Sequence, residues 1–128
     1  MSVIEDFQGL RVIVVEDDSM ICLLIEDMLS ELGCKVVGTA SDLKRATELA
    51  QRDESIDVAI LDVNLRGQLV FPVADILSKR GIPFLFASGM GAEGLPPDWQ
   101  GHCSVQKPMT MATLATALGR AIRQQSQI

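Results

Sequence analysis

Four short apolar runs, each followed by a polar side chain, constrain the fold of this 128-residue chain more than any other feature. The runs cover residues 10–15, 58–61, 82–87 and 103–106. Near-continuous apolar runs of this length are typical of strands that are buried on both faces of a parallel sheet. Open α/β sheets bind ligands at the carboxyl ends of such strands, and the polar residues found there are Glu16, Asp17, Asp18, Asp62, Ser88 and Lys107.

The stretches between these runs have helical periodicity. An apolar stripe between residues 21 and 32 predicts a first helix, and similar spacing predicts a second helix opened by Ser41 or Asp42. Pro72 is tolerated only in the first turn of a helix, so the third helix should start near residue 70 or 71. Strands that alternate with helices predict a doubly wound α/β fold with a parallel sheet.

Three further segments complete this pattern. Residues 35–39 predict another short strand, and the apolar spacing after Thr110 predicts a closing helix. Between the last two apolar runs, residues 89–101 are rich in Gly and Pro. We expect a loop there, or at most one irregular turn, where a fourth helix would otherwise stand.

The composition fits a single domain. Hydrophobic residues make up 48% of the chain and the mean hydropathy is +0.26, which is enough to build a core without disulfide bonds. We expect one domain over residues 8–124, with residues 1–7 and 125–128 as terminal tails. No output domain is expected beyond the closing helix, so the sequence favours a stand-alone module.

Charge and cysteine content exclude several functions. The net charge of −6 argues against direct binding to nucleic acid, which needs clustered Lys and Arg. No apolar stretch is long enough to span a membrane, and residues 1–6 are acidic where a signal peptide would be basic. The three cysteines are far apart and fit neither a disulfide framework nor a zinc site. We therefore expect a cytoplasmic protein without membrane contacts.

The acids after the first strand favour a bound cation. Glu16, Asp17 and Asp18 are adjacent, and adjacent carboxylates repel one another unless a positive group lies nearby. Hard divalent cations such as Mg²⁺ prefer oxygen ligands, so Glu16 and Asp17 would form a site with Asp62 if their strands are neighbours. The alternative is that the acids only cap the first helix. Capping needs one residue, Asp18 or Ser19, which leaves the other acids for a metal.

Asp62, Ser88 and Lys107 suggest chemistry only as a group. Beside a metal, the Asp62 carboxylate can attack a phosphoryl group and form an acyl phosphate. Lys107, held extended by the following Pro108, would stabilise the phosphoryl oxygens, and Ser88 would offer one of them a hydroxyl. Taken singly, each of these residues is more often a turn former or a solvated side chain.

Together these residues resemble the site of a bacterial response-regulator receiver domain, and the resemblance covers nearly the whole chain. The acidic pair of that family matches Glu16 and Asp17, the phosphoacceptor matches Asp62, the Ser/Thr matches Ser88, and the Lys-Pro pair matches Lys107 and Pro108. The resemblance implies a flavodoxin-like sheet of five parallel strands in the order 2-1-3-4-5. It also implies a cis peptide bond between Lys107 and Pro108.

The same resemblance implies a metal site and partners. Mg²⁺, or Mn²⁺ as an alternative, would be held by Asp17, Asp62 and the backbone carbonyl of Asn64, with Glu16 acting chiefly through water. A sensor histidine kinase or a histidine phosphotransfer protein would supply the phosphoryl group, and an unknown downstream protein would receive the signal. Such a protein is a monomer or a weak homodimer. It catalyses its own phosphorylation and dephosphorylation but is not a turnover enzyme.

Residues 86–90 (Phe-Ala-Ser-Gly-Met) further resemble the Phe-Ala-Thr-Gly-aromatic signature of an atypical receiver subgroup found largely in alphaproteobacteria. The fourth helix is short or poorly formed in that subgroup. Most receivers have Tyr or Phe at the position of Ser104, three residues before the lysine, and this aromatic reports phosphorylation. We hypothesise that a disorder-to-order change of residues 89–101 replaces it.

Two alternatives remain open. A pseudo-receiver would keep the fold as a protein-binding module without phosphorylation, although the acids, Asp62 and Lys107 are all present. A small Mg²⁺-dependent aspartyl-phosphate phosphatase would need a second Asp where Asn64 stands, and asparagine cannot protonate a leaving group. His102 is expected to be a surface or turn residue, and Trp99 is expected to be partly buried against the core.

Overall fold

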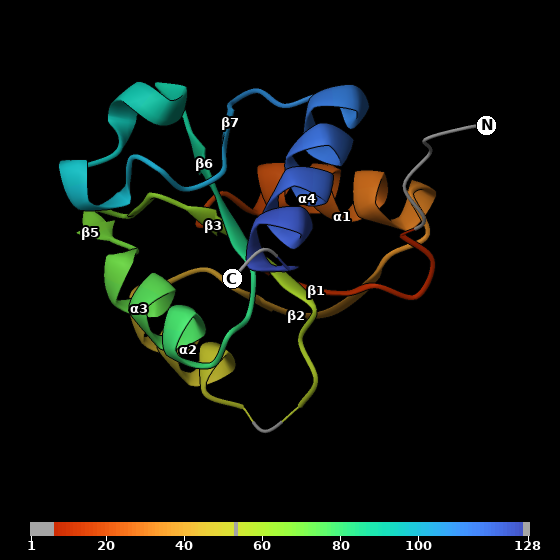
Figure 1. Ribbon diagram of the computed structural model, residues 1–128, viewed down its shortest axis with the longest axis horizontal. Coiled ribbons are helices and arrows are strands. Elements are labelled where there is room, and N and C mark those ends of the chain that lie inside the picture. Colours follow the sequence, from red (N-terminus) through yellow and green to blue (C-terminus); the bar gives the residue numbers. More distant parts are fainter. Residues whose placement is uncertain (1–6, 53, 127–128) are drawn as a thin grey trace.

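A five-stranded parallel sheet forms the centre of the protein (Figure 1). The computed structural model describes residues 7–52 and 54–126. Across the sheet the strands run in the order β2 (Lys35–Ala40), β1 (Arg11–Val15), β3 (Val58–Asp62), β6 (Phe84–Ser88) and β7 (Ser104–Gln106), and each neighbouring pair is parallel. The predicted order 2-1-3-4-5 is confirmed, with β6 and β7 as the fourth and fifth strands.

Helices cover both faces of the sheet, as the doubly wound prediction required. The helices are α1 (Ser19–Glu31), α2 (Leu43–Ala50), α3 (Phe71–Lys79) and α4 (Met111–Ser126). In β1, Val12 and Val14 belong to the core shared with α1 and α4, whereas Ile13 and Val15 belong to the core shared with α2 and α3. All four side chains are fully buried, which explains why this strand reads as a continuous apolar run.

The helices start where their capping residues predicted. The Asp18 side chain accepts hydrogen bonds from two amides in the first turn of α1, and the Asp42 side chain accepts one in α2. α3 begins at Phe71, so Pro72 lies in the first turn, where its missing amide hydrogen costs nothing. Thr110 precedes α4 and its hydroxyl accepts a hydrogen bond from the Thr113 amide.

A small hairpin, which was not predicted from the sequence, follows β3. β4 (Asn64–Leu65) and β5 (Gln68–Leu69) pair antiparallel. The turn residues have positive φ, 53° at Arg66 and 88° at Gly67. Two consecutive left-handed residues define the type I′ turn, which joins two-residue hairpins because its twist matches that of the strands. Among the described residues, Arg66 is the one non-glycine residue with a positive φ.

The Gly- and Pro-rich segment is also more ordered than expected. It contains two 3₁₀ helices, η1 (Gly91–Gly94) and η2 (Pro97–Trp99), so the prediction of at most one irregular turn was wrong. The expectation of a short, irregular replacement for the fourth helix is confirmed. The physical reason is that apolar side chains stand among the helix-breaking residues, and one of them, Leu95, is buried in the core.

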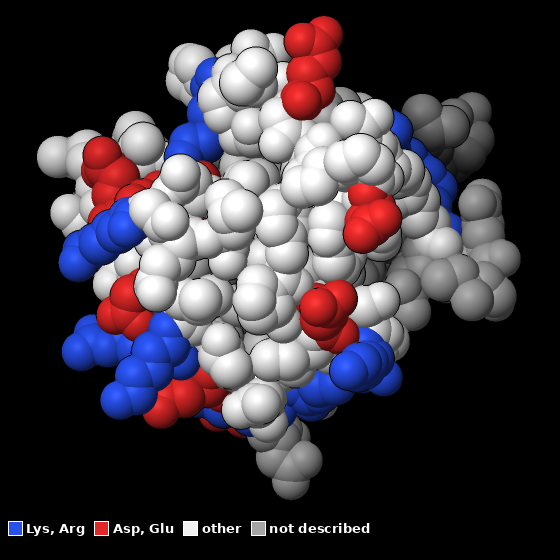
Figure 2. Space-filling model, turned by 90° about the vertical axis from the view of Figure 1, so that its left-hand side faces the viewer, with Lys and Arg blue, Asp and Glu red and all other residues white. Residues whose placement is uncertain are grey.

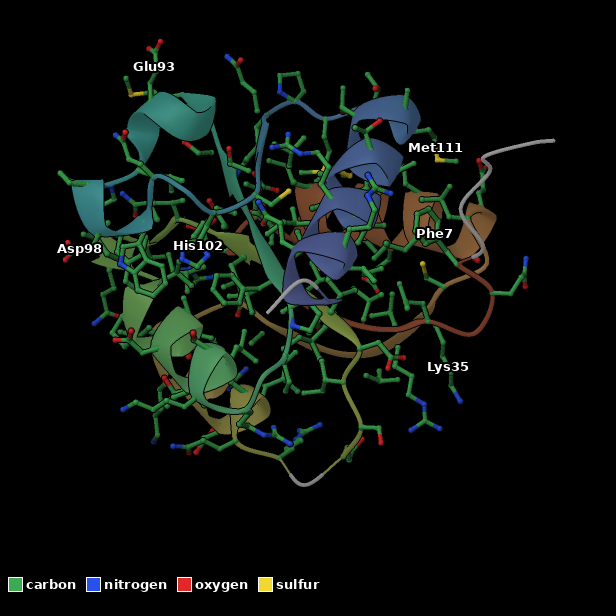
Figure 3. All side chains as sticks on the ribbon, viewed as in Figure 1. Phe7, Lys35, Glu93, Asp98, His102 and Met111 are labelled. Carbon is green, nitrogen blue, oxygen red and sulfur yellow. The ribbon has the colours of Figure 1, made fainter. Side chains whose placement is uncertain are left out.

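An aromatic cluster anchors η2 to the sheet. It consists of Phe71, Phe84, Phe86, Trp99 and His102. The Trp99 ring stacks on Phe71 at a centroid distance of 5.6 Å, and His102 stacks on Phe84 at 5.3 Å. Figure 3 shows His102 turned toward this cluster, while Glu93 and Asp98 point outward. Trp99 is half-buried against the core as predicted, and His102 packs as an aromatic side chain.

The folded region extends beyond the limits expected from sequence. Phe7, assigned to the N-terminal tail, is 5% exposed and belongs to the core beside α1 and α4. α4 continues to Ser126, past the expected boundary at residue 124. Residues 1–6 and 127–128 of the expected tails lie outside the described residues. Among the described helices, none has the length and apolar character needed to cross a membrane.

One face of the molecule carries few charges. Figure 2 shows the side that bears α3, β5, η1 and η2, where most side chains are uncharged, acidic ones are scattered and basic ones lie toward the margin. The sequence has no Lys or Arg from residue 81 to residue 106. Leu69 and Met90 are 51% and 65% exposed. This face therefore offers apolar contacts next to the end of β6.

Candidate functional site

The carboxyl ends of β1 and β3 bring three acids together. Val15 of β1 lies opposite Leu61 of β3, so the residues that follow each of them are neighbours. One carboxylate oxygen from each of Glu16, Asp17 and Asp62 lies within 4.8 Å of the others. Glu16 and Asp62 are almost completely buried, at 2% and 6% exposure. The predicted neighbourhood of these acids is confirmed.

Lys107 reaches into this cluster from the end of β7. Its Nζ lies 3.1 Å from Oε1 of Glu16 and 3.3 Å from Oδ1 of Asp62. The Lys107 amide donates to the carbonyl of Ser88. This hydrogen bond continues the ladder between β7 and β6 and fixes the backbone of Lys107. The peptide bond between Lys107 and Pro108 is cis, as the family resemblance implied.

Ser88 ends β6 beside these residues, but its hydroxyl is engaged elsewhere. Ser88 Oγ accepts a hydrogen bond of 3.0 Å from the Met90 amide, in the turn that leads to η1. The preceding residue, Ala87, pairs with Asp62 across the sheet. Ser88 is therefore next to the acid cluster with its hydroxyl held by the following loop.

Asp17 is tied to the hairpin. Its Oδ2 accepts a 2.9 Å hydrogen bond from the Arg66 amide, at the tip of the β4–β5 turn. Burial alone would raise the pKa of Asp17, but hydrogen bonds from Glu16 and from the Arg66 amide outweigh it and hold the pKa below its usual value. Asp17 therefore stays ionised at neutral pH.

The pKa of Glu16 is shifted in the opposite direction to that of Asp17. Burial, followed by hydrogen bonding with Asp62 and the Asp62 charge, raises its pKa from 4.5 to about 7, although the Asp18 amide partly opposes the shift. Burial acts to lower the pKa of Lys107, but the charges of Asp62 and Glu16 prevail and raise it. Lys107 thus remains a cation within a cluster that carries more negative than positive charge.

The donor set of this cluster fits a divalent cation. Carboxylate oxygens are the ligands that Mg²⁺ prefers, and three of them converge here with excess negative charge. Receiver domains, the family that the sequence resembles, typically bind Mg²⁺, which would supply positive charge to phosphoryl oxygens when it is bound. Asn64 lies at the start of β4, and its side-chain Oδ1 accepts from the Gly67 amide. Its backbone carbonyl as a metal ligand stays a prediction.

Two hollows adjoin the cluster. A cleft of about 460 Å³ extends from Glu16 and Asp17 between α1 and the end of β2, with Arg45 and Arg66 on its wall. A narrower groove of about 80 Å³ lies between α1 and the loop after β7, lined by Ile21, Leu24, Ile25, Met28, Lys107, Pro108 and Met109. Both hollows make the site approachable from the α1 side.

Two contributors to the site were not predicted from the sequence. The Arg66 amide acts through its backbone, which no side-chain pattern reveals, although Gly67 between two short polar-apolar pairs is a signal for a tight turn. Gly94 of η1 lies against the Ser88 hydroxyl. Nothing in a single sequence marks such a contact across six residues of irregular chain.

The sheet order, the converging acids and the lysine on them define a class of signalling proteins. Residues 12–92 match the family model described as the response regulator receiver domain, and the chain belongs to this family. Members of this family are regulators rather than turnover enzymes.

Similar solved structures agree with this assignment. SdrG from Sphingomonas melonis Fr1 is 37% identical, with a TM-score of 0.79 over 89% of this chain and 97% of that chain. The receiver domain of PhyR from Erythrobacter litoralis, 24% identical with a TM-score of 0.77 over 91% of this chain and 92% of that one, shares the fold. Both are atypical alphaproteobacterial receiver-domain proteins, the group suggested by residues 86–90.

Curated relatives are more distant and longer. The transcriptional regulatory protein PdtaR from Mycobacterium tuberculosis is 29% identical over 116 residues, which are 88% of this chain and 56% of that protein. Ethylene receptor 2 from Oryza sativa subsp. japonica is 28% identical over 131 residues, 94% of this chain and 17% of the receptor. The chain thus spans about half or less of these proteins.

Proposed function

We propose that Asp62 accepts a phosphoryl group from a phosphohistidine in a Mg²⁺-dependent step, and that the protein works as a stand-alone response regulator. The observation that carries this proposal is the position of Lys107 Nζ, 3.1 Å from Glu16 and 3.3 Å from Asp62, above three converging carboxylates. Such an arrangement suits the transfer of a charged phosphoryl group to an oxygen better than it suits a structural ion pair, because each buried charge is costly to desolvate.

In the proposed step an Asp62 oxygen attacks phosphorus, the P–N bond breaks, and the donor imidazole leaves with the electron pair. Asp17, Asp62 and the Asn64 carbonyl would hold Mg²⁺, with Glu16 contributing through water. Lys107 shifts its contact from Asp62 to a phosphoryl oxygen as the charge moves outward. Ser88 donates its hydroxyl to a second phosphoryl oxygen.

The donor protein would dock on α1. Met20, Leu23 and Leu24 are exposed on this helix, at 65%, 56% and 54%, beside the groove that runs to Pro108 and Met109. Exposed apolar side chains at helical spacing suit the helical surface of a kinase or a phosphotransfer protein. The phosphohistidine would then enter at the end of the groove, near Lys107.

A downstream protein would bind the phosphorylated form. The sparsely charged face with Leu69 and Met90 adjoins Ser88 and is available for such contacts. In this role the protein modifies only itself and does not turn over a substrate. SdrG also has a solution structure in a BeF3-activated conformation, which supports the use of beryllofluoride as a phosphoryl mimic in experiments.

The proposal is tested by incubating the protein with acetyl phosphate and Mg²⁺ and measuring its intact mass. We expect a phosphate adduct on the wild type and none on Asp62→Asn. The matched control is Asp57→Asn, which changes the aspartate that directly precedes β3, at the end of the strand away from the site. A wild type that takes up no phosphate would favour the pseudo-receiver, and sustained hydrolysis of phosphate esters would favour the phosphatase.

A further inference from the structure

The loop after β6 surrounds the Ser88 hydroxyl on two sides. Ser88 Oγ accepts from the Met90 amide, and the backbone of Gly94 lies on its other side. A Cβ placed on Gly94 would come within 2.7 Å of Ser88 Oγ and 3.2 Å of Met90 Cβ. The first distance is too short for any real contact, so the hydroxyl can rest on the Met90 amide only because residue 94 has no side chain.

The same loop is joined to the edge strand of the sheet. Gln106 of β7 donates from Nε2 to the Gly89 carbonyl at 3.3 Å, and a Cβ placed on Gly91 would lie in van der Waals contact with the Gln106 side chain. η1 therefore spans the ends of β6 and β7, in contact with both. Ser104, where most receivers carry the reporting aromatic, is only a small half-buried residue of β7.

We propose that Gly94 positions the Ser88 hydroxyl, so that η1, rather than an aromatic side chain at residue 104, responds when the hydroxyl turns toward the phosphoryl group. Met90 follows Ser88 in its own loop, whereas Asp62 lies on the neighbouring strand. When the Ser88 hydroxyl turns toward Asp62, its hydrogen bond with the Met90 amide breaks and the space beside Gly94 is vacated. η1 then moves closer to Ser88, and the hydrogen bond of Gln106 transmits this displacement to β7.

A double-mutant cycle tests the contact itself. Gly94→Ala should lower the urea midpoint of unfolding in the wild-type background, because the new methyl group collides with the resting hydroxyl. The loss should largely disappear in the Ser88→Ala background, where no hydroxyl is present. Gly89→Ala is the matched control, since a Cβ there meets nothing within 4 Å.

A beryllofluoride titration with Mg²⁺, followed by ¹⁵N NMR, tests the consequence for the site. Because Gly94→Ala disfavours the resting position, we expect its titration midpoint to fall about fivefold, the factor that one ordinary hydrogen bond of the resting state supplies. In the wild type, hydrogen exchange at the Met90 amide should accelerate on titration. This last measurement needs no variant and holds even if Gly94→Ala folds poorly.

The inference rests on the proposed function, because beryllofluoride has to bind at Asp62. A wild type that takes up neither phosphate nor beryllofluoride would overturn the proposed function. If the wild type binds beryllofluoride normally, the inference alone is overturned by any of three results. These are an equal effect of Gly94→Ala in both backgrounds, an unchanged or raised midpoint, and an unaltered Met90 amide.

Discussion

At the scale of single residues, Glu16 combines an acidic neighbour with a basic one. Burial and then Asp62 favour the protonated form of Glu16, while Lys107 Nζ lies 3.1 Å from its Oε1. The folded-state pKa of about 7 lies above the ordinary value of 4.5. The folded protein therefore binds a proton that the unfolded chain releases between these values.

Glu16 should make the metal-free protein less stable as pH rises. Its contribution is fully present below about pH 4.5 and is lost as the pH passes 7, with an upper limit of about 3 kcal/mol. Urea unfolding in EDTA across this range is expected to show the decline in the wild type and a flatter profile in Glu16→Gln. Glu31→Gln, an exposed residue of α1, should keep the wild-type profile. Parallel profiles for Glu16→Gln and wild type would contradict this assignment.

The residues that carry charge at the site could be recognised from the sequence. Asp62 ends one apolar run and Lys107 follows another. A polar residue coincides with the end of each run because buried strands end where polar groups can reach solvent or a ligand. Gly94 and the Arg66 amide could not be recognised. Their roles depend on the path of irregular backbone, which is decided by packing rather than by local pattern.

At the scale of secondary-structure elements, the β4–β5 hairpin depends on backbone conformation. Gly67 has φ 88°, and a Cβ at this position meets nothing within 4 Å. Gly67→Ala should therefore cost about 1 kcal/mol of unfolding free energy through conformation alone.

Gly101→Ala provides the comparison for this hairpin prediction. A Cβ on Gly101 also meets nothing within 4 Å, and Gly101 does not have a positive φ. Its urea midpoint should stay near that of the wild type. Equal midpoints for the two variants would show that the turn does not constrain the hairpin.

The two 3₁₀ helices should respond differently to phosphorylation. η1 contacts Ser88 and Gln106, whereas η2 is held by the Trp99 ring against Phe71 and Phe86. Hydrogen exchange with and without beryllofluoride is expected to change at residues 89–94 and to stay constant at residues 97–102. The earlier hypothesis, a disorder-to-order change of residues 89–101, is thereby restricted to residues 89–94. A change of equal size in both segments would refute the narrower form.

The described elements of five or more residues were predictable, and so was the three-residue strand β7, but the hairpin strands β4 and β5 and the two 3₁₀ helices were not. α1 and β1 have enough apolar positions to establish a period, and Asp18 and Pro72 mark helix starts by known chemistry. β4 and β5 have two residues each, which is too few for an alternation to be visible. η2 forms because Trp99 gains contacts in the core, although its prolines alone suggest a loop.

At the scale of the whole molecule, metal binding should be measurable as an increase in the free energy of unfolding. Mg²⁺ at 100 times its dissociation constant should add about 2.7 kcal/mol to the unfolding free energy at pH 8, because it binds only where β1 and β3 are paired. Asp17→Asn and Asp62→Asn should each abolish this increment, measured as the Mg²⁺-dependent rise in Tm.

Asp18→Asn is the control for the metal experiment. Asp18 is adjacent to Asp17, but it caps α1, and asparagine caps helices equally well. This variant should keep the full Mg²⁺-dependent rise in Tm. A similar loss in all three variants would mean that Mg²⁺ responds to the overall negative charge rather than to a site.

The division of the core into two layers has a practical consequence. The aromatic cluster lies wholly on the α2–α3 side of the sheet, whereas Cys22, Cys34 and Cys103 all pack on the α1–α4 side. Trp99 is the one tryptophan of the chain. Its fluorescence and the rate of thiol labelling therefore monitor opposite layers of the same protein without any introduced probe. Recorded together during unfolding, they would reveal whether the two layers come apart at once or in sequence.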